Sequence, residues 1–476
     1  MQIEISSKLK FDKFNALVLG VCEKTVFEDK LIDTLLFKTR ESNFENDSWS
    51  TLYNENFLHI TFVKLDDKEE EVYIADLVEQ IRKLKKKKIT HLGIDFNACV
   101  EVSPNPKRTQ RRLVEQTYLA SNEGFNLKQN KDANSLENVT LVFEEKDESV
   151  INEALVLAEM TQLARRLVNL PPNKMTPSIL ANEAVELGAS RGFEVEILEE
   201  KHIEALKMEA YLSVAKGSAE KPQLIIMRYH GNSKEEKRFG LVGKGLTYDS
   251  GGYSIKPTDS MVNMKNDMGG AAAVIGAMGA IASMKLPYNV TAVVAACENM
   301  ISGTAYRPGD IIGSMSGKTI YVANTDAEGR LTLADAIYYI QTIEKVDMLI
   351  DIATLTGAAV YSFGDSATPV VTNDETLYKV VEKSFSKSID LVWKMPNLPE
   401  YHKQVKHELA DLTNSGGRPG VMTAAAFLEA FVIDRPWVHI DIAATAFLSK
   451  EKGMRPSGAT GIGVMGLYHT LKKLSK

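Results

Sequence analysis

The 476-residue sequence has only three cysteines, Cys22, Cys99 and Cys297, and no two of them form a CxxC pair. An odd number of widely spaced cysteines provides no disulfide framework and is typical of a reducing compartment. No apolar run approaches the roughly 20 residues that a membrane helix needs, and the first residues lack the basic and apolar segments of a signal peptide. We therefore expect a cytoplasmic protein that does not associate with membranes.

Basic residues are outnumbered by acidic ones, with 56 Lys and Arg against 63 Asp and Glu. The net charge of -7 argues against general binding to nucleic acid or to anionic membranes. The exception is the basic run at residues 82–88, which contains five lysines and one arginine. Such runs usually lie at a solvated helix end, and that is the favoured interpretation here. DNA binding is kept as the alternative function, and a steep salt dependence of duplex binding would reveal it.

Several catalytic and nucleotide-binding motifs are missing. The eight histidines form no HExxH or HxxxH pair, which argues against a zinc site of the thermolysin type, and no GxSxG nucleophile elbow occurs. Residues 313–319 resemble a phosphate-binding loop but have three residues between their glycines, and they lead into a strand. Residues 461–466 match GxGxxG but follow no strand, so they predict tight packing of the last helix and no dinucleotide site.

The chain is long enough for two domains. Residues 1–150 alternate strand-like runs with helix-period segments, which predicts a small α/β domain. An amphipathic helix over 149–169 leads into the proline-rich stretch 170–177. We therefore expect a connecting helix and linker at 151–175 and a second domain at 176–476.

The second half also has an α/β pattern. Its buried-strand runs lie at 223–227, 239–243, 289–295, 348–352 and 437–442. Segments 269–284 and 331–343 between them are expected to be covering helices. Apolar strands of this kind are buried on both faces, so the pattern predicts a central mixed sheet, at least partly parallel, with helices on both sides.

The stretch with the densest group of candidate functional residues is Asn324-Thr325-Asp326-Ala327-Glu328-Gly329-Arg330-Leu331. It lies between an apolar run at 320–323, expected to be a strand, and a helix-like segment that begins at Leu331. Such a turn lies at the carboxyl edge of a sheet, where open α/β folds bind ligands. Asp326 and Glu328 could reach one cation, and Arg330 offers a planar fork to a carboxylate-like anion. Charges this crowded predict a metal or an ion network.

A second stretch with candidate functional residues is 242–252. A strand is expected to end there in a glycine-rich turn that carries Lys244 and Asp249. Asp267 precedes the glycine-rich start of a helix. Taken singly, Asp249 could be a turn residue and Asp267 a helix cap. Together with the two acids of the first stretch they supply four carboxylates from three loops, which is enough oxygen to hold two divalent ions.

The octapeptide at 324–331 resembles the signature of the leucyl (cytosol) aminopeptidases at every position. Other segments resemble the same family: 242–245, 249–252, 254–257, 267–272, 298–300, 307–310 and 353–357. The resemblance extends from about Val168 to the C-terminus, whereas the first 150 residues show no clear family motif. It implies a macro-domain-like N-terminal α/β domain, a larger catalytic α/β domain and assembly as a homohexamer.

The resemblance also implies a site for two divalent metal ions, Mn²⁺ or Zn²⁺, in each subunit. Asp249 and Glu328 would bridge both ions. Asp326 would bind one ion, whereas Lys244 and Asp267 would bind the other. A lysine ligand must be neutral, so Lys244 would lose its proton to the metal.

The remaining implied roles concern the substrate. Lys256 and Arg330 would form the catalytic pair, with a bicarbonate ion on Arg330 as the base. The pocket for the first side chain would be lined by Met264, Thr354, Gly357 and Ala443. We therefore expect a leucyl aminopeptidase that hydrolyses the first bond of peptides with a free α-amine and prefers apolar N-terminal residues such as leucine.

Overall fold

The computed structural model describes residues 1–9, 13–41, 46–53, 56–87, 89–122, 127–128, 136–232, 234 and 237–474. The chain divides into two compact units, one formed by residues 1–159 and 450–456 and the other by residues 160–449 and 457–476. The division falls inside helix α5 (Glu148–Asn169), which the sequence predicted at 149–169. In the part of the chain that the structure describes, no helix is long and apolar enough to span a membrane.

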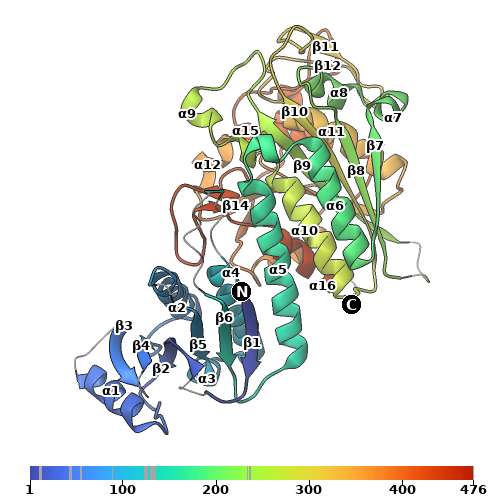
Figure 1. Ribbon diagram of the computed structural model, residues 1–476. Helices are drawn as coiled ribbons and strands as arrows, with labels where there is room; N and C mark the ends of the chain where they lie inside the picture. Colours follow the sequence, from blue (N-terminus) through green and yellow to red (C-terminus); the bar gives the residue numbers. More distant parts are fainter. Residues whose placement is uncertain are drawn as a thin grey trace. The chain divides into compact units, whose positions relative to one another are not determined.

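The first unit is built on a six-stranded sheet with the order β1-β6-β5-β2-β4-β3 (Figure 1). Neighbouring strands are parallel except for β3, which runs antiparallel to β4. Its strands are β1 (Gln2–Ser6), β2 (Ala16–Val21), β3 (Asn46–Tyr53), β4 (Asn56–Lys64), β5 (His91–Asp95) and β6 (Asn138–Val142). Its helices are α1 (Lys30–Glu41), α2 (Glu70–Lys85), α3 (Asn97–Glu101) and α4 (Pro106–Ser121). The α/β prediction for this half is confirmed.

The basic run at 82–88 covers the C-terminal turn of α2, where cations complement the helix dipole. Arg82 is buried and donates a hydrogen bond of 2.6 Å to the carbonyl of Gly453, and Lys83 pairs with Glu79 at 2.7 Å. Lys88 lies outside the described residues. The interpretation as a helix end is confirmed, and the charges of Arg82 and Lys83 are engaged within the unit. They therefore lend no support to DNA binding.

The second unit contains an eight-stranded sheet with the order β15-β14-β17-β13-β9-β10-β8-β7. The central strands β17, β13, β9 and β10 are parallel, whereas β14, β8 and β7 introduce antiparallel pairs. This confirms the prediction of a mixed, partly parallel sheet. The strands are β7 (Glu194–Glu199), β8 (Gln223–His230), β9 (Arg238–Asp249), β10 (Asn289–Asn299), β13 (Met348–Ala353), β14 (Thr368–Thr372), β15 (Val392–Lys394) and β17 (Trp437–Asp441).

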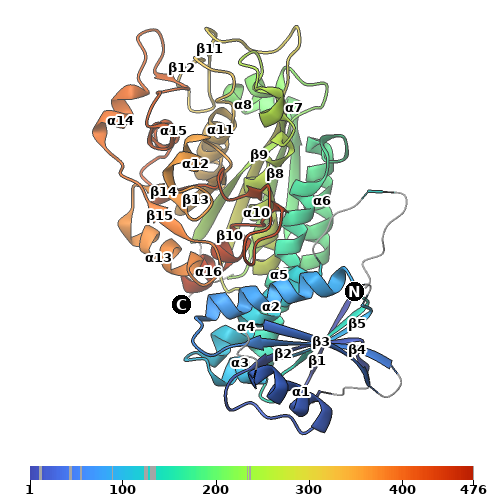
Figure 2. The same cartoon turned by 90° about the vertical axis from the view of Figure 1, so that its left-hand side faces the viewer.

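Helices cover both faces of this sheet (Figure 2). On β9, Gly240 lies against Ile340 of one helix and Gly243 against Gly270 of another. An odd spacing along a strand places these two contacts on opposite faces. One face carries α6 (Pro177–Arg191), α10 (Gly269–Ser283) and α16 (Val464–Leu474), and the other carries α8 (Glu209–Ala215), α11 (Gly329–Thr342) and α15 (Gly420–Glu429).

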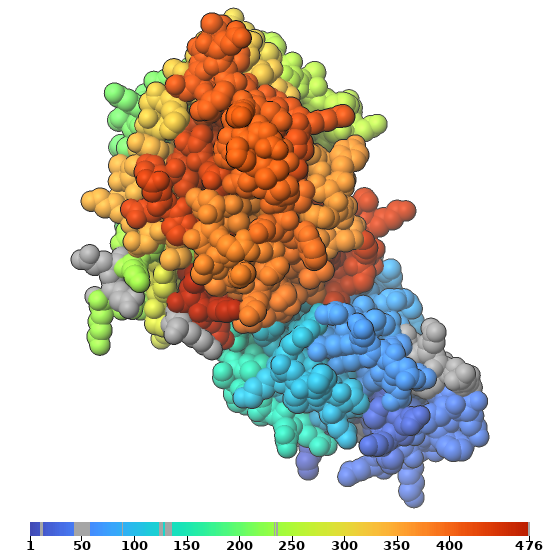
Figure 3. Space-filling view, turned by 180° about the vertical axis from the view of Figure 1, so that it is seen from behind, coloured from blue at the N-terminus to red at the C-terminus, as the bar shows by residue number. Residues whose placement is uncertain are grey.

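The unit also contains further helices and strands. They are η2 (Pro172–Lys174), α7 (Glu200–Ala205), α9 (Thr258–Met261), η3 (Met264–Asn266), α12 (Ala358–Phe363), α13 (Glu375–Phe385), α14 (Pro399–Gln404), β18 (Phe447–Leu448) and β19 (Gly458–Ala459). Orange residues, from the part of the chain that contains α13 and β15, cover much of the face that Figure 3 presents. This region includes β15, the edge strand at one end of the eight-stranded sheet.

The two stretches that resemble nucleotide-binding motifs, 461–466 and 313–319, make contacts within the protein. At the start of α16, a Cβ on Gly463 would lie 2.5 Å from Ile352, and one on Gly466 would lie 2.6 Å from the ring of Phe385. The prediction of tight packing there is confirmed. In the 313–319 loop, the backbone N–H of Met315 donates to buried Asp335 at 2.8 Å. That loop leads into a strand, as predicted, and its Met315 N–H is committed to the protein itself.

Candidate metal centre

Strand β9 supplies the first two charged side chains of the site. The sequence placed Lys244 and Asp249 in a turn, but β9 is continuous from Arg238 to Asp249, so Lys244 lies within the strand. The glycine at 243 has a packing cause: a Cβ there would lie 2.7 Å from the carbonyl oxygen of Gly270 in α10. Only glycine allows the helix to approach the strand so closely.

The 324–331 loop supplies the next group. Its preceding strand, β12 (Ile320–Tyr321), is only two residues long. It pairs with β11 (Ile311–Ile312) and β16 (Leu412–Thr413) in a separate three-stranded sheet, so the expectation that it ends at the edge of the main sheet is wrong. The helix begins at Gly329, two residues earlier than predicted.

Hydrogen bonds bring this loop to the end of β9 nonetheless. The hydroxyl of Thr325 donates to the carbonyl of Gly251 at 2.7 Å, and the backbone N–H of Ser254 donates to the same hydroxyl at 2.7 Å. From the other side, the Asn414 amide donates to the carbonyl of Asn324 at 2.6 Å. The loop is therefore held between two segments that are far away in the sequence.

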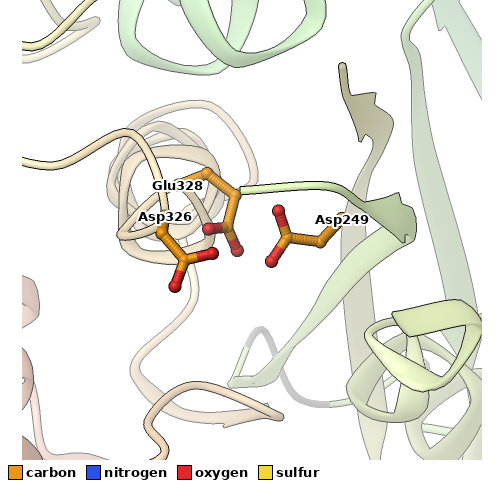
Figure 4. A group of neighbouring side chains, drawn as sticks. All are labelled: Asp249, Asp326 and Glu328. Atoms are coloured by element: carbon orange, nitrogen blue, oxygen red, sulfur yellow. The ribbon is translucent and has the colours of Figure 1, made fainter. Parts of the chain in front are cut away.

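Three carboxylates converge as a result. Single oxygen atoms of Asp249, Asp326 and Glu328 all lie within 4.8 Å of one another. Figure 4 shows the three groups turned toward one another from the end of β9, the loop before α11 and the start of α11. Asp249 and Glu328 are buried, and Asp326 is partly exposed. An oxygen-rich cluster of this size suits a divalent cation.

Lys244 joins Asp267 to this cluster. Its ammonium group lies 2.8 Å from an oxygen of Asp267 and 2.8 Å from Oε1 of Glu328, and it donates to the carbonyl of Thr354 at 2.9 Å. The hydroxyl of Thr354 donates to Asp267 at 2.9 Å. The structure thus places Lys244 and Asp267 on one side of Glu328, while Asp326 lies within reach on another.

Lys256 lies against the other two acids. Its ammonium group is 2.6 Å from Asp326 and 3.0 Å from Asp249. The side chain is 17% exposed, so it is partly open to a substrate. The five predicted metal ligands and Lys256 therefore form one connected group of charges, in which the carboxylates outnumber the ammonium groups.

Burial and neighbouring charges shift the pKa values of the acids in this cluster. Burial and the neighbouring Glu328 raise the pKa of Asp249 to about 6, and burial raises the pKa of Asp267 well above its usual value. Burial alone would also raise the pKa of Glu328, but the charges of Lys244 and Lys256 outweigh it and lower that pKa. Burial also raises the pKa of Asp326, so three of the four acids resist ionisation with lysines as their ion-pair partners. Additional positive charge would keep all of them ionised.

The donor set fits divalent ions. Oε2 of Glu328 is buried and has no hydrogen-bond partner among the described residues. An unsatisfied buried carboxylate oxygen is costly unless a proton donor or a cation meets it. Carboxylate oxygens and a lysine nitrogen are ligands that Mn²⁺ and Zn²⁺ both accept. The residues present therefore suit the metals that the sequence resemblance implied.

A cavity of about 540 Å³ opens onto this cluster. Arg330 lines it and is 9% exposed, and within the described residues its Nε has no hydrogen-bond partner. Burial lowers the pKa of Arg330 to about 10, which leaves the group charged at neutral pH. The four residues predicted for the substrate pocket also line this cavity: Met264, Thr354, Gly357 and Ala443.

One residue that supports the site had no role in the sequence analysis. Asn299, at the end of β10 and fully buried, donates to Asp249 at 2.8 Å and to the carbonyl of Thr325 at 3.0 Å. It therefore fixes the orientation of Asp249 and ties the end of β9 to the 324–331 loop. Its only sequence signal was its place in the 298–300 segment of the family resemblance.

Gly329 provides a steric test of this geometry. A Cβ at Gly329 would collide with the side chain of Lys244. We expect Gly329→Ala to displace Lys244 and to lower metal affinity and peptidase activity by about 10- to 100-fold, as loss of a supporting residue typically does. Isothermal titration with Mn²⁺ and peptidase kinetics would measure both effects.

Gly303→Ala is the matched control, because a Cβ there meets nothing within 4 Å and its backbone is not left-handed. Both variants should keep the far-ultraviolet circular dichroism of the wild type. Equal metal affinity in the two variants would contradict the steric argument.

Comparison with known proteins identifies the family of the chain. The model of the cytosol aminopeptidase family, catalytic domain, matches residues 162–468. A probable cytosol aminopeptidase of Treponema denticola is 41% identical over 478 residues, which cover 97% of this chain and 99% of that protein. Another, of Clostridium tetani, is 54% identical over 351 residues, or 73% of each chain. The solved structure of the bottromycin maturation enzyme BotP is similar with a TM-score of 0.85 at 29% identity, covering 97% of this chain and 99% of that one. The chain therefore belongs to the cytosol aminopeptidase family of metal-dependent peptidases.

Proposed function

We propose that this protein is a two-metal leucyl aminopeptidase, which releases apolar N-terminal residues such as leucine from peptides with a free α-amine. The observation that carries this proposal is the convergence of Asp249, Asp326 and Glu328 beside a cavity, where one buried oxygen of Glu328 has no hydrogen-bond partner among the described residues. The family assignment supports aminopeptidase chemistry. The leucine preference and the number of metals are the parts that need testing.

For the metals, we propose that Asp249 and Glu328 would hold both ions. Asp326 would also hold one of them, and Lys244 with Asp267 would hold the other. The carboxylates around Lys244 outweigh its burial and raise its pKa, so binding at that position must release a proton. A BotP structure is described as a complex with Mn, which supports Mn²⁺ as the first ion to try here.

Two bound divalent ions would supply a water molecule of lowered pKa and positive charge near the peptide carbonyl. The chain's own residues do the rest. Lys256 stays protonated, because Asp249, Glu328 and Asp326 outweigh its burial and raise its pKa. It is placed to donate to the carbonyl oxygen as negative charge develops there.

Arg330 and the cavity wall position the reactants. The Nε of Arg330 has no hydrogen-bond partner among the described residues, and we propose that the guanidinium holds bicarbonate, which would supply a base in a cavity that no histidine lines. Gly357 and Ala443 are small and Met264 is apolar, so the wall that they form with Thr354 leaves room for a leucine-sized side chain. Thr354 also holds Asp267, so it connects the substrate pocket to the metal centre.

Hydrolysis of leucine p-nitroanilide by metal-stripped protein tests the proposal. We expect no activity without metal, restoration by Mn²⁺ or Zn²⁺, and no hydrolysis of the N-acetylated substrate, because the blocked amine cannot bind a metal. A series of N-terminal residues from glycine to phenylalanine would rank the preference. Inactivity with every metal and every residue, or equal hydrolysis of the N-acetylated substrate, would refute the proposal.

We also propose a cytoplasmic location and a homohexamer. The three cysteines are buried and unpaired, as in proteins of reducing compartments. Leu409 is 73% exposed and Trp393 is 64% exposed. Contacts between copies of the chain would bury these apolar side chains. Light scattering would measure the mass of the assembly.

A further inference from the structure

A second cavity, of about 760 Å³, adjoins the first. It is formed by α12 and by the loop that enters α15, and Figures 1 and 2 both show these two helices beside one another. Ala358 and Gly420 line both cavities, so the two spaces meet at these residues. The proposed mechanism makes no use of the second cavity.

At the meeting point Ala358 and Gly420 lie close together: a Cβ at Gly420 would lie 2.8 Å from the Cβ of Ala358, closer than two carbon atoms can approach. Glycine at the first residue of α15 therefore lets the two helices approach each other. Both residues are partly exposed and line both cavities, so a peptide that leaves the metal centre on this side can run across them into the second cavity.

The two cavities differ in charge. The first is lined by the four carboxylates of the metal centre and by three basic residues, Lys244, Lys256 and Arg330. The second is lined by apolar and neutral residues, which include Tyr361, Val421 and Met422, and by a single charged residue, Arg418. Arg418 is exposed, and the described part of the chain offers its guanidinium no ion-pair partner. This lining suits an apolar group that carries one negative charge.

We propose that the second cavity binds the C-terminal part of a short peptide substrate and that Arg418 pairs with the free α-carboxylate of that peptide. The inference rests on the proposed function and narrows its substrate class. With the scissile bond at the metal centre and the first side chain in the first cavity, the downstream residues run across Ala358 and Gly420 into the second cavity. Short peptides with a free C-terminus are then better substrates than the same peptides with an amidated C-terminus.

The test compares kcat/KM for Leu-Leu, Leu-Leu-Leu and Leu-Leu-Leu-Leu, each as free acid and as C-terminal amide, on the Mn²⁺-loaded protein. We expect the free acid to be favoured about fivefold at one or more of these lengths, the effect of an exposed ion pair. Arg418→Gln should bring this ratio to about 1, and Arg418→Glu should bring it below 1. The ratio compares two substrates on one enzyme, so a general loss of activity cancels.

Arg435→Gln is the matched control, because Arg435 is an exposed arginine of the same unit that lines neither cavity. It should keep the wild-type ratio. A wild-type ratio of 1 at every length, or an unchanged ratio in Arg418→Gln, would overturn the inference. Leucine p-nitroanilide separates the two proposals: hydrolysis of it without discrimination between acid and amide refutes only the carboxylate site, whereas no hydrolysis of any substrate refutes the proposed function.

Discussion

Glu328→Gln is expected to lower kcat/KM for leucine p-nitroanilide by more than about a hundredfold. Loss of a residue that only supports a metal ligand lowers activity by about 10- to 100-fold, and loss of a ligand itself should have a larger effect. Glu328 is 1% exposed, and its free Oε2 lies in the carboxylate cluster. Glutamine keeps the shape but removes the charge and replaces an oxygen ligand with an amide group. Among the described residues, the variant also leaves Asp267 as the one carboxylate within ion-pair distance of Lys244.

Metal content and steady-state kinetics, measured on the same preparation, would test this expectation. The matched control is Glu375→Gln, since Glu375 forms a surface pair with Lys394 away from the cavity. It should retain wild-type activity and metal content. A Glu328→Gln enzyme with full metal content and normal kcat/KM would show that the carboxylate is not a ligand.

Lys256→Gln is expected to lower kcat by about 100- to 1,000-fold, as removal of a single oxyanion donor does, while KM changes little. The positive charge at Lys256 matters most when negative charge develops on the carbonyl oxygen. The ammonium group also lies against Asp249 and Asp326, where it competes with a cation. Its loss should therefore leave metal affinity unchanged or higher, which separates its role from that of Glu328.

Titration of Mn²⁺ into the stripped variant and full Michaelis–Menten analysis would measure both quantities. Lys216→Gln is the matched control, since Lys216 is exposed in the same unit and its hydrogen bonds to Leu212 and Thr304 use its backbone N–H and carbonyl, not its side chain. A fall in metal affinity equal to the fall in kcat would show that Lys256 assembles the site and does not act on the transition state.

Local pattern was sufficient for much of the fold. The run predicted at 223–227 lies in β8, and the helix predicted at 149–169 is α5. Such elements are specified by the period and the hydrophobicity of their own residues. The charged residues of 324–331 were also recognisable in isolation, because two acids and an arginine in a short turn are costly unless they bind something.

The errors arose where distant segments decide the structure. β12 belongs to a small sheet because its partner strands come from residues 311–312 and 412–413, and no local pattern shows this. Lys244 lies inside β9 although glycines flank it. Gly243 is there because α10 packs against the strand at that point, so a residue that predicts a turn instead marks a close helix contact.

By itself, the sequence determined which residues carry charge and the identity of the family, because both depend on side-chain chemistry and on the order of motifs. Only the tertiary structure decided which charges meet. Lys244 pairs with Asp267 and Glu328, and Lys256 pairs with Asp249 and Asp326, because β9 and the start of α11 lie against each other in space. Electrostatic energies depend on distance and burial, and neither quantity is contained in the spacing of residues along the chain.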